Sequence, residues 1–174
     1  MKIGHCQIEF TKGDITDQED LDAIVNAANA ELMSGGGVAG AIHNAAGSQL
    51  AESARAFAPI SPGEAVTTKA FDLPNQYVIH CLGPVYGKNE PADQLLSNCY
   101  TNAILEAEKN KIQSLGFPAI STGAFGYPVE EATEVALKAV KSAIQEIKHL
   151  THIRFILFSK KDYDIYQSKA EELL

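Results

Sequence analysis

Short apolar runs alternate along the chain with longer stretches in which apolar residues recur every three or four positions. The short runs are rich in Val, Ile and Phe and too short for helices, so they predict β-strands. Strands that alternate with helical patterns are typical of an α/β layer fold. The predicted strands cover residues 5–10, 23–26, 77–82, 115–120 and 153–158, with a weaker sixth at residues 65–68.

The helical spacing is clearest in two long stretches. Residues 92–107 and residues 132–147 each place their apolar side chains on one face, and Pro128 stands where a first-turn proline is tolerated. A last helix is expected from about Asp162, with Tyr166 on its buried face. These helices and the strands form one continuous pattern without a linker.

A fourth, shorter helix is predicted from a capping pattern. Thr16 is followed three residues later by Glu19, which is the spacing of a capping box, so a helix is expected to begin at Asp17. Asp14 would then lie in the loop between a strand and this helix.

The composition is that of a globular domain with a buried core. The 174 residues suit a single domain spanning residues 1–174, and 45% of them are hydrophobic. Lys and Arg number 14 against 22 Asp and Glu, so the net charge is −8. Because an acidic surface repels phosphate backbones, broad nucleic-acid binding is disfavoured.

The sequence predicts a cytoplasmic protein that does not enter a membrane. No apolar stretch is long enough to span a bilayer, and the N-terminus lacks the apolar run of a secretory signal. The three cysteines, Cys6, Cys81 and Cys99, form no CxxC pattern and cannot pair completely. Such cysteine usage suits a reducing compartment better than a disulfide scaffold.

Three junctions between predicted strands and the segments after them have unusual sequences. They are residues 13–16, residues 26–40 with three consecutive glycines, and residues 121–128 with two further glycines. In open α/β sheets, ligands bind outside the carboxyl ends of strands, where loops meet helix N-termini. We therefore expect the three junctions to form one site.

The two glycine-rich junctions suggest a site for phosphate. Backbone N–H groups of Gly35 to Gly37 can approach an anion closely because no side chain shields them, and a helix N-terminus favours negative charge. The alternative is a flexible turn or a tight packing joint. The loop at residues 121–126 repeats the same chemistry, so two loops could grip one pyrophosphate. Neither loop has the Walker A or Rossmann spacing.

Polar residues at the junctions suggest how a nucleotide could be held. Asp14 could accept a hydrogen bond from an exocyclic amine, or it could shape its own loop as an Asx turn. Asn26 and Asn29 offer donor and acceptor groups that suit a ribose diol. For Asn26 the structural role, satisfying buried loop backbone, is the favoured interpretation.

Metal binding and covalent catalysis have little support in the sequence. The pairs at residues 5–6 and 80–81 combine His with Cys, but adjacent strand residues point to opposite faces, so each pair offers a metal one side chain. His43 falls near the buried face of the helix after the glycines, where a core histidine is more common than a base. No serine stands in a GxSxG elbow. We expect neither a metal nor a cofactor.

Taken in order, these motifs resemble the macro domain family of ADP-ribose-binding modules. The resemblance runs through residues 13–16, 23–29, 35–37, 78–84 and 118–123. It implies a three-layer α/β/α fold with a central mixed sheet. Residues 40–47, 63–65 and 125–128 are similar to the MacroD-type branch, whose members remove mono-ADP-ribose from acidic side chains and deacetylate O-acetyl-ADP-ribose.

The resemblance implies a role for each junction. Asp14 would hold the adenine amine, Ile15 would supply a backbone contact beside it, and Phe158 would stack on the adenine. Asn29 would hold the distal ribose and act as the catalytic residue, with Phe125 packing over that ribose. The pyrophosphate would lie between two walls, formed by Gly35, Gly36, Gly37 and Val38 on one side and by Ser121, Gly123, Ala124, Phe125 and Gly126 on the other.

One departure from the MacroD-type pattern bears on catalysis. That branch carries an Asp directly after the Val of its glycine loop, where it helps to place or activate the attacking water, and this chain has Ala39. Loss of an acid or base group typically costs about 10²- to 10⁴-fold in rate, so a slow enzyme is expected. The alternatives are a non-catalytic reader of ADP-ribose and an ADP-ribose 1″-phosphatase.

The resemblance also suggests the partners. They would be free ADP-ribose together with ADP-ribosylated proteins or O-acetyl-ADP-ribose, bound by a monomer without nucleic acid or membrane.

Overall fold

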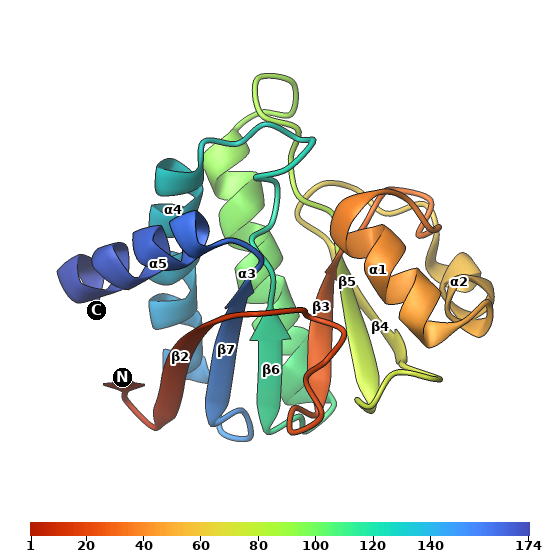
Figure 1. The fold of residues 1–174 in the computed structure, drawn as a ribbon, viewed down its shortest axis with the longest axis horizontal. Helices are drawn as coiled ribbons and strands as arrows, with labels where there is room; N and C mark the ends of the chain where they lie inside the picture. The colour runs from red at the N-terminus through yellow and green to blue at the C-terminus, as the bar shows by residue number, and fades with distance from the viewer.

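Seven strands form one mixed sheet in the computed structural model, which describes residues 1–174 (Figure 1). In sheet order they are β1 (Lys2–Ile3), β2 (Cys6–Lys12), β7 (His152–Leu157), β6 (Ser114–Phe117), β3 (Ala23–Ala27), β5 (Tyr77–Cys81) and β4 (Ala65–Lys69). The five central strands are parallel, and β1 and β4 run antiparallel at the two edges. The parallel strands therefore end at one common edge of the sheet.

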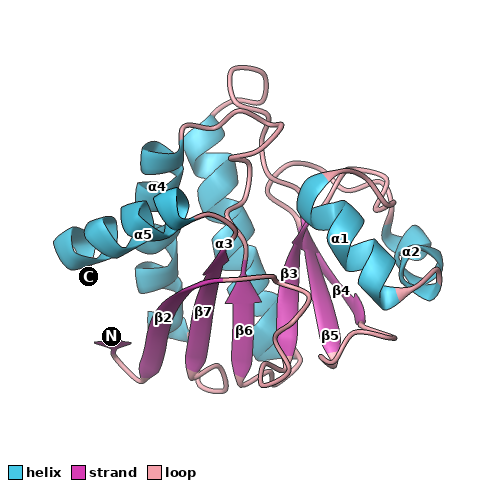
Figure 2. Cartoon of the chain, viewed as in Figure 1, coloured by secondary structure: helices cyan, strands magenta, loops and turns pink.

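Helices cover both faces of the sheet and give three α/β/α layers (Figure 2). They are α1 (Gly37–Ala46), α2 (Gln49–Ala54), α3 (Ala92–Lys109), α4 (Val129–Ala143) and α5 (Lys160–Leu173), with 3₁₀ turns at Arg55–Phe57 and Ile144–Glu146. Helices α3, α4 and α5 pack on one face, while α1 and α2 pack on the other. None of the helices is both long and apolar enough to cross a membrane.

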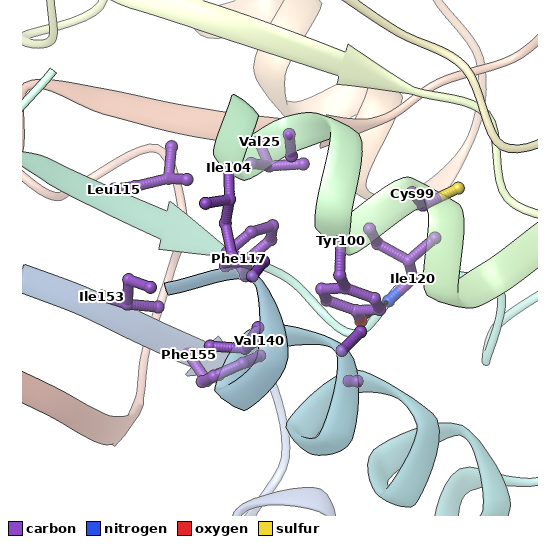
Figure 3. Close-up of a cluster of buried hydrophobic side chains, with 14 of the residues drawn as sticks. Val25, Cys99, Tyr100, Ile104, Leu115, Phe117, Ile120, Val140, Ile153 and Phe155 are labelled. Carbon is purple, nitrogen blue, oxygen red and sulfur yellow. Dashed lines mark hydrogen bonds between the residues drawn. The ribbon is translucent and has the colours of Figure 1, made fainter. Parts of the chain in front are cut away.

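Side chains that point to alternate faces of the strands contribute to two separate cores. In β3, Val25 joins the larger core under α3 and α4, whereas its neighbour Ile24 joins the smaller core under α1. This follows from the two-residue period of a strand. In the larger core, the ring centroid of Phe117 lies 5.1 Å from that of Tyr100 and 5.5 Å from that of Phe155 (Figure 3). These buried aromatic contacts join α3 to β6 and β7.

Most predicted elements are confirmed. All six predicted strands are present, and α3 begins at Ala92 as the spacing indicates. The strand expected at residues 115–120 ends earlier, at Phe117, because Pro118 has no N–H to donate to a sheet ladder. The helix expected to reach residue 147 ends at Ala143 and continues as a 3₁₀ turn. The short elements β1 and α2 were not predicted.

The predicted short helix beginning at Asp17 is wrong. Residues 14–20 form turns instead, in which the backbone N–H of Asp17 donates to the carbonyl of Asp14 at 3.1 Å. The side chain of Thr16 donates to the Asp14 carboxylate at 2.6 Å, so it does not cap a helix. Local side-chain bonds of this kind compete with helix formation.

Candidate functional site

The loops at the carboxyl edge of the sheet enclose a cavity of about 340 Å³. This volume lies within the range of about 300–1,000 Å³ that is usual for small-molecule sites. The junctions after β3 and β6 both contribute to it. Nine of the predicted site residues line the cavity, namely Asn29, Gly35, Gly36, Gly37, Val38, Ser121, Gly123, Ala124 and Phe125.

The first wall is the start of α1. Gly36 is the N-cap residue with an extended backbone, and Gly37 adopts a left-handed φ of +56°, which glycine tolerates without strain. No side chain caps this helix end, and its first turn contains no acidic residue. The first N–H groups of a helix have no partners within the helix, and the helix dipole makes them attractive to an anion. The wall is therefore suited to bind phosphate.

The second wall is the turn between β6 and α4. Ser121 has a φ of +68°, which is unusual for a residue with a side chain and places it among the strained conformations found at functional sites. Its hydroxyl donates to the carbonyl of Pro84 at 2.8 Å, and its own carbonyl accepts from the N–H of Tyr127 at 2.9 Å. The N–H of Gly126 closes the turn by donating to the carbonyl of Gly123 at 3.0 Å. Gly126 thus shapes the wall without lining the cavity.

The half-buried side chain of Asn29 lies at the cavity beside the first wall. Its Oδ1 accepts from the N–H of Met33 at 3.0 Å, and its Nδ2 donates to the carbonyl of Met33 at 2.9 Å. The carboxamide therefore fixes the loop that leads into the glycines. One Nδ2 hydrogen and one Oδ1 lone pair remain for a ligand.

Asp14, Ile15 and Phe158 do not line this cavity; they lie where two neighbouring strands end. Because Lys12 of β2 pairs with Leu157 of β7, the loop with Asp14 and the exposed ring of Phe158 emerge side by side. Phe158 is 89% exposed, so its face is open to a planar partner. Ile15 is buried in the core against which Val38 also packs. These contacts connect the Asp14 loop to the first wall.

The Asp14 carboxylate forms an Asx turn and remains exposed. It accepts from the N–H of Thr16 at 2.9 Å as well as from the Thr16 hydroxyl. The hydrogen bond from that hydroxyl is the main cause of a pKa below the ordinary value, so Asp14 is ionised at neutral pH. Asp14 can therefore both shape its own loop and accept a hydrogen bond from a ligand amine, since its second oxygen is free of protein partners.

Several lining residues were not predicted as part of the site. Most of them have small side chains, and most lie at or shortly after the end of a strand, so little in the sequence distinguishes them from other loop residues. They are Ala27, Ala28, Ala39, Gly83, Ala119 and Ile120. Ala39 drew attention in the sequence only because an Asp was expected there. A signal for the others exists in their position after β3, β5 and β6, but small residues are common in loops.

Asn26 and two histidines lie beneath the first wall, outside the cavity. The amide of Asn26 bonds to Nδ1 of His80 at 3.1 Å, and Nε2 of His80 bonds to the hydroxyl of Thr68 at 3.0 Å. Asn26 therefore has a structural role, although its partner is a side chain and not the loop backbone. His43 is buried as predicted, with its ring 6.4 Å from that of His80.

We expect this cluster to make stability fall in mild acid. Burial lowers the pKa of His80 to about 3, below the value of about 6.5 in an unfolded chain. The neutral His80 side chain therefore makes its full contribution to the free energy of unfolding above pH 6.5, and this contribution is lost as the pH falls toward 3. Between about pH 7 and about pH 5, His80 should account for a loss of about 2 kcal/mol.

Urea unfolding of the wild type and of His80→Gln at the two pH values measures this loss. The variant should lose about 2 kcal/mol less than the wild type on acidification. An equal loss in both proteins would show that His80 is not held neutral in the fold.

The cysteines are buried thiols, and the acidic residues form no cluster that could hold a metal ion. All three thiols are free and buried, and burial raises the pKa of Cys6 to about 11 and that of Cys99 to about 12. Thiols with such pKa values are poor nucleophiles at neutral pH. No group of three or more His, Cys, Asp and Glu side chains is placed to hold a metal ion.

Comparisons with known proteins agree with this geometry. A profile of the Macro domain family matches residues 25–136. A macro domain-containing protein of Caldanaerobacter subterraneus is 43% identical over 172 residues, which cover 96% of this chain and 97% of that protein. An O-acetyl-ADP-ribose deacetylase of an Enterobacter species is 43% identical over 167 residues, which cover 92% of each.

Solved structures show the same fold. The Oceanobacillus iheyensis macrodomain with ADP has a TM-score of 0.94 at 38% identity, covering 99% of this chain and 94% of that one. The Trypanosoma brucei macrodomain in complex with ADP-ribose has a TM-score of 0.86 at 39% identity, covering 94% and 68%. The chain therefore belongs to the Macro domain family.

Proposed function

We propose that the protein binds ADP-ribose in the cavity between its two glycine-rich walls. The observation that carries this proposal is the uncapped, acid-free N-terminus of α1 facing the same cavity as the turn after β6. Two sets of backbone donors at one cavity suit the two phosphates of a pyrophosphate. Macrodomains of similar structure have been solved with ADP and ADP-ribose, which supports the same ligand here.

The residues around the cavity suggest an orientation for the ligand. The adenine would lie between the ends of β2 and β7, with its amine on Asp14, its edge beside the backbone of Ile15 and its face on Phe158. The pyrophosphate would then lie at the start of α1, beside Val38. Val38 packs against the core that contains Ile15, so the two regions are neighbours. The distal ribose would lie beside Asn29 and under Phe125.

We further propose that the bound ligand is an ADP-ribose ester and that the protein hydrolyses it. The ester would be O-acetyl-ADP-ribose or a mono-ADP-ribosylated Asp or Glu side chain of another protein. Water would attack at the distal ribose and the ester bond would break, so that the ribose leaves with a hydroxyl and the acyl group leaves as a carboxylic acid. Asn29 and the helix N–H groups would orient the ribose and the water, since positioned donors lower a barrier without a protein base.

Ala39 argues for a slow reaction. It lines the cavity in the first turn of α1, and that turn contains no carboxylate to activate water. The same observation favours the second candidate, a reader that binds ADP-ribose without turnover. A phosphatase acting on ADP-ribose 1″-phosphate would use the same pocket and would release phosphate without cleaving an ester.

Time courses on an ADP-ribosylated protein, on O-acetyl-ADP-ribose and on ADP-ribose 1″-phosphate separate these functions. We expect slow turnover by the wild type, and we expect Ala39→Asp to raise it by less than Asn29→Ala lowers it, because positioned donors would supply most of the rate. A wild type without measurable turnover, beside an Ala39→Asp variant with clear turnover, would make the natural protein a reader.

The proposal also includes the cellular compartment and the oligomeric state of the protein. Three unpaired, buried thiols support a reducing compartment, which we take to be the cytoplasm. The protein would act there as a monomer on ADP-ribose esters.

A further inference from the structure

Gly40, the fourth residue of α1, lies directly against the first wall of the cavity. A Cβ added to Gly40 would collide with the carbonyl oxygen of Gly35 and would lie 3.4 Å from the carbonyl carbon. The colliding atom belongs to the backbone, so it cannot turn aside as a flexible side chain would. Gly35 can therefore rest on α1 only because residue 40 has no side chain.

Gly35 also lies close to Asn29. A Cβ built on Gly35 would lie 3.4 Å from Nδ2 of Asn29, which is van der Waals contact. Asn29 is itself fixed by its two hydrogen bonds to Met33. Gly35 thus lies close to both the backbone of α1 and the Asn29 carboxamide, so a shift of Gly35 changes its position relative to Asn29.

The other glycines of this wall have no such neighbours. A Cβ on Gly36 or Gly37 would meet nothing within 4 Å, because both face open space at the cavity. Gly40 does not line the cavity. Glycine is less favourable than alanine within a helix, so helix propensity alone would favour alanine at position 40.

We propose that Gly40 is a positioning residue that sets the distance between the phosphate wall and Asn29. It acts by allowing Gly35 to pack against α1, and it touches no ligand itself. This inference rests on the proposed function for its effect on ADP-ribose. Its effect on the position of Gly35 is independent of any ligand.

The test is Gly40→Ala, compared with Ala41→Gly as a matched control. Ala41 is an exposed neighbour in α1, so the control lowers helix propensity without touching Gly35. In amide NMR spectra without ligand, Gly40→Ala should shift the signals of Gly35 and of the Asn29 side chain but not those of α5. Its melting midpoint should fall modestly while the variant stays folded, because the cost of relieving the collision with Gly35 outweighs the gain in helix propensity.

Ligand binding gives the second readout. Gly40→Ala should weaken ADP-ribose binding by about ten-fold, because a small misplacement of one wall disturbs both the pyrophosphate and the distal ribose. Binding of AMP, which lacks the second phosphate and the distal ribose, should change less than about two-fold. Ala41→Gly should leave both affinities unchanged.

Three results would overturn the proposal. Unshifted Gly35 and Asn29 signals would show that the backbone tolerates the methyl group in place. A failure to fold or shifts spread through α5 would make Gly40 a general packing residue. Equal losses for AMP and ADP-ribose would also contradict a role between the wall and Asn29. If the wild type bound no ADP-ribose, the proposed function would fail, whereas the ligand-free spectra would still decide the role of Gly40.

Discussion

Replacing Asn29 with alanine is expected to lower the turnover of an ADP-ribose ester by about 10²- to 10³-fold, with a much smaller effect on affinity. Asn29 has a free donor and a free acceptor at the cavity, and it holds the loop before the glycines through Met33. The substitution removes the group that would orient the ribose and the water. Single-turnover rates and calorimetric affinities for the same variant separate the two effects.

Two variants make this prediction specific. Asn29→Asp keeps an oxygen that can accept from the N–H of Met33 but loses the Nδ2 donor, so it should retain the loop and still turn over slowly. Asn44→Ala changes an exposed side chain on α1 and should behave as the wild type. If Asn29→Ala lost affinity and kept its maximal rate, Asn29 would be a binding residue without a role in the chemical step.

Replacing Asp14 with alanine is expected to weaken ADP-ribose binding by about 10- to 100-fold, the usual range for losing a hydrogen bond to a charged group. The pKa of Asp14 is lowered chiefly by the Thr16 hydroxyl, so a carboxylate is present at neutral pH to accept from the adenine amine. The preference for adenine should relax as well. Calorimetry with ADP-ribose and with its hypoxanthine analogue measures both effects.

Controls for Asp14 separate base recognition from loop shape. Asp14→Asn keeps one oxygen that can accept from Thr16, but its NH2 group would face the adenine amine, so it should keep the loop shape and still lose affinity as Asp14→Ala does. Asp17→Ala removes an exposed carboxylate from the same turn and should leave binding unchanged. An unchanged affinity in Asp14→Ala would place the adenine elsewhere.

The sequence predicted the strands, the long helices and the two glycine walls because each depends on local pattern. The apolar runs of β5 and β7 and the helical spacing of α3 are properties of short windows. The glycines at residues 35–37 identify a wall by their lack of side chains. The position of these segments at strand ends indicated one site, the resemblance assigned their roles, and the structure brings nine of the predicted residues to one cavity.

What the sequence did not predict depends on contacts between distant segments or on competing local bonds. Asn26 faces His80 only because β3 and β5 pair in a register that places them side by side. The turn at Asp14 replaces a predicted helix because the carboxylate bonds to Thr16. The contact between Gly40 and Gly35 needs the path of the loop into α1. None of these contacts produces a periodic pattern.

Calorimetric titration of the wild-type protein with ADP-ribose tests the central claim most directly. We predict saturable binding of one ADP-ribose per chain, lost or strongly weakened in Asp14→Ala. Absence of binding by the folded protein, checked by its NMR spectrum in the same preparation, would contradict the assignment of the glycine-walled cavity as an ADP-ribose site.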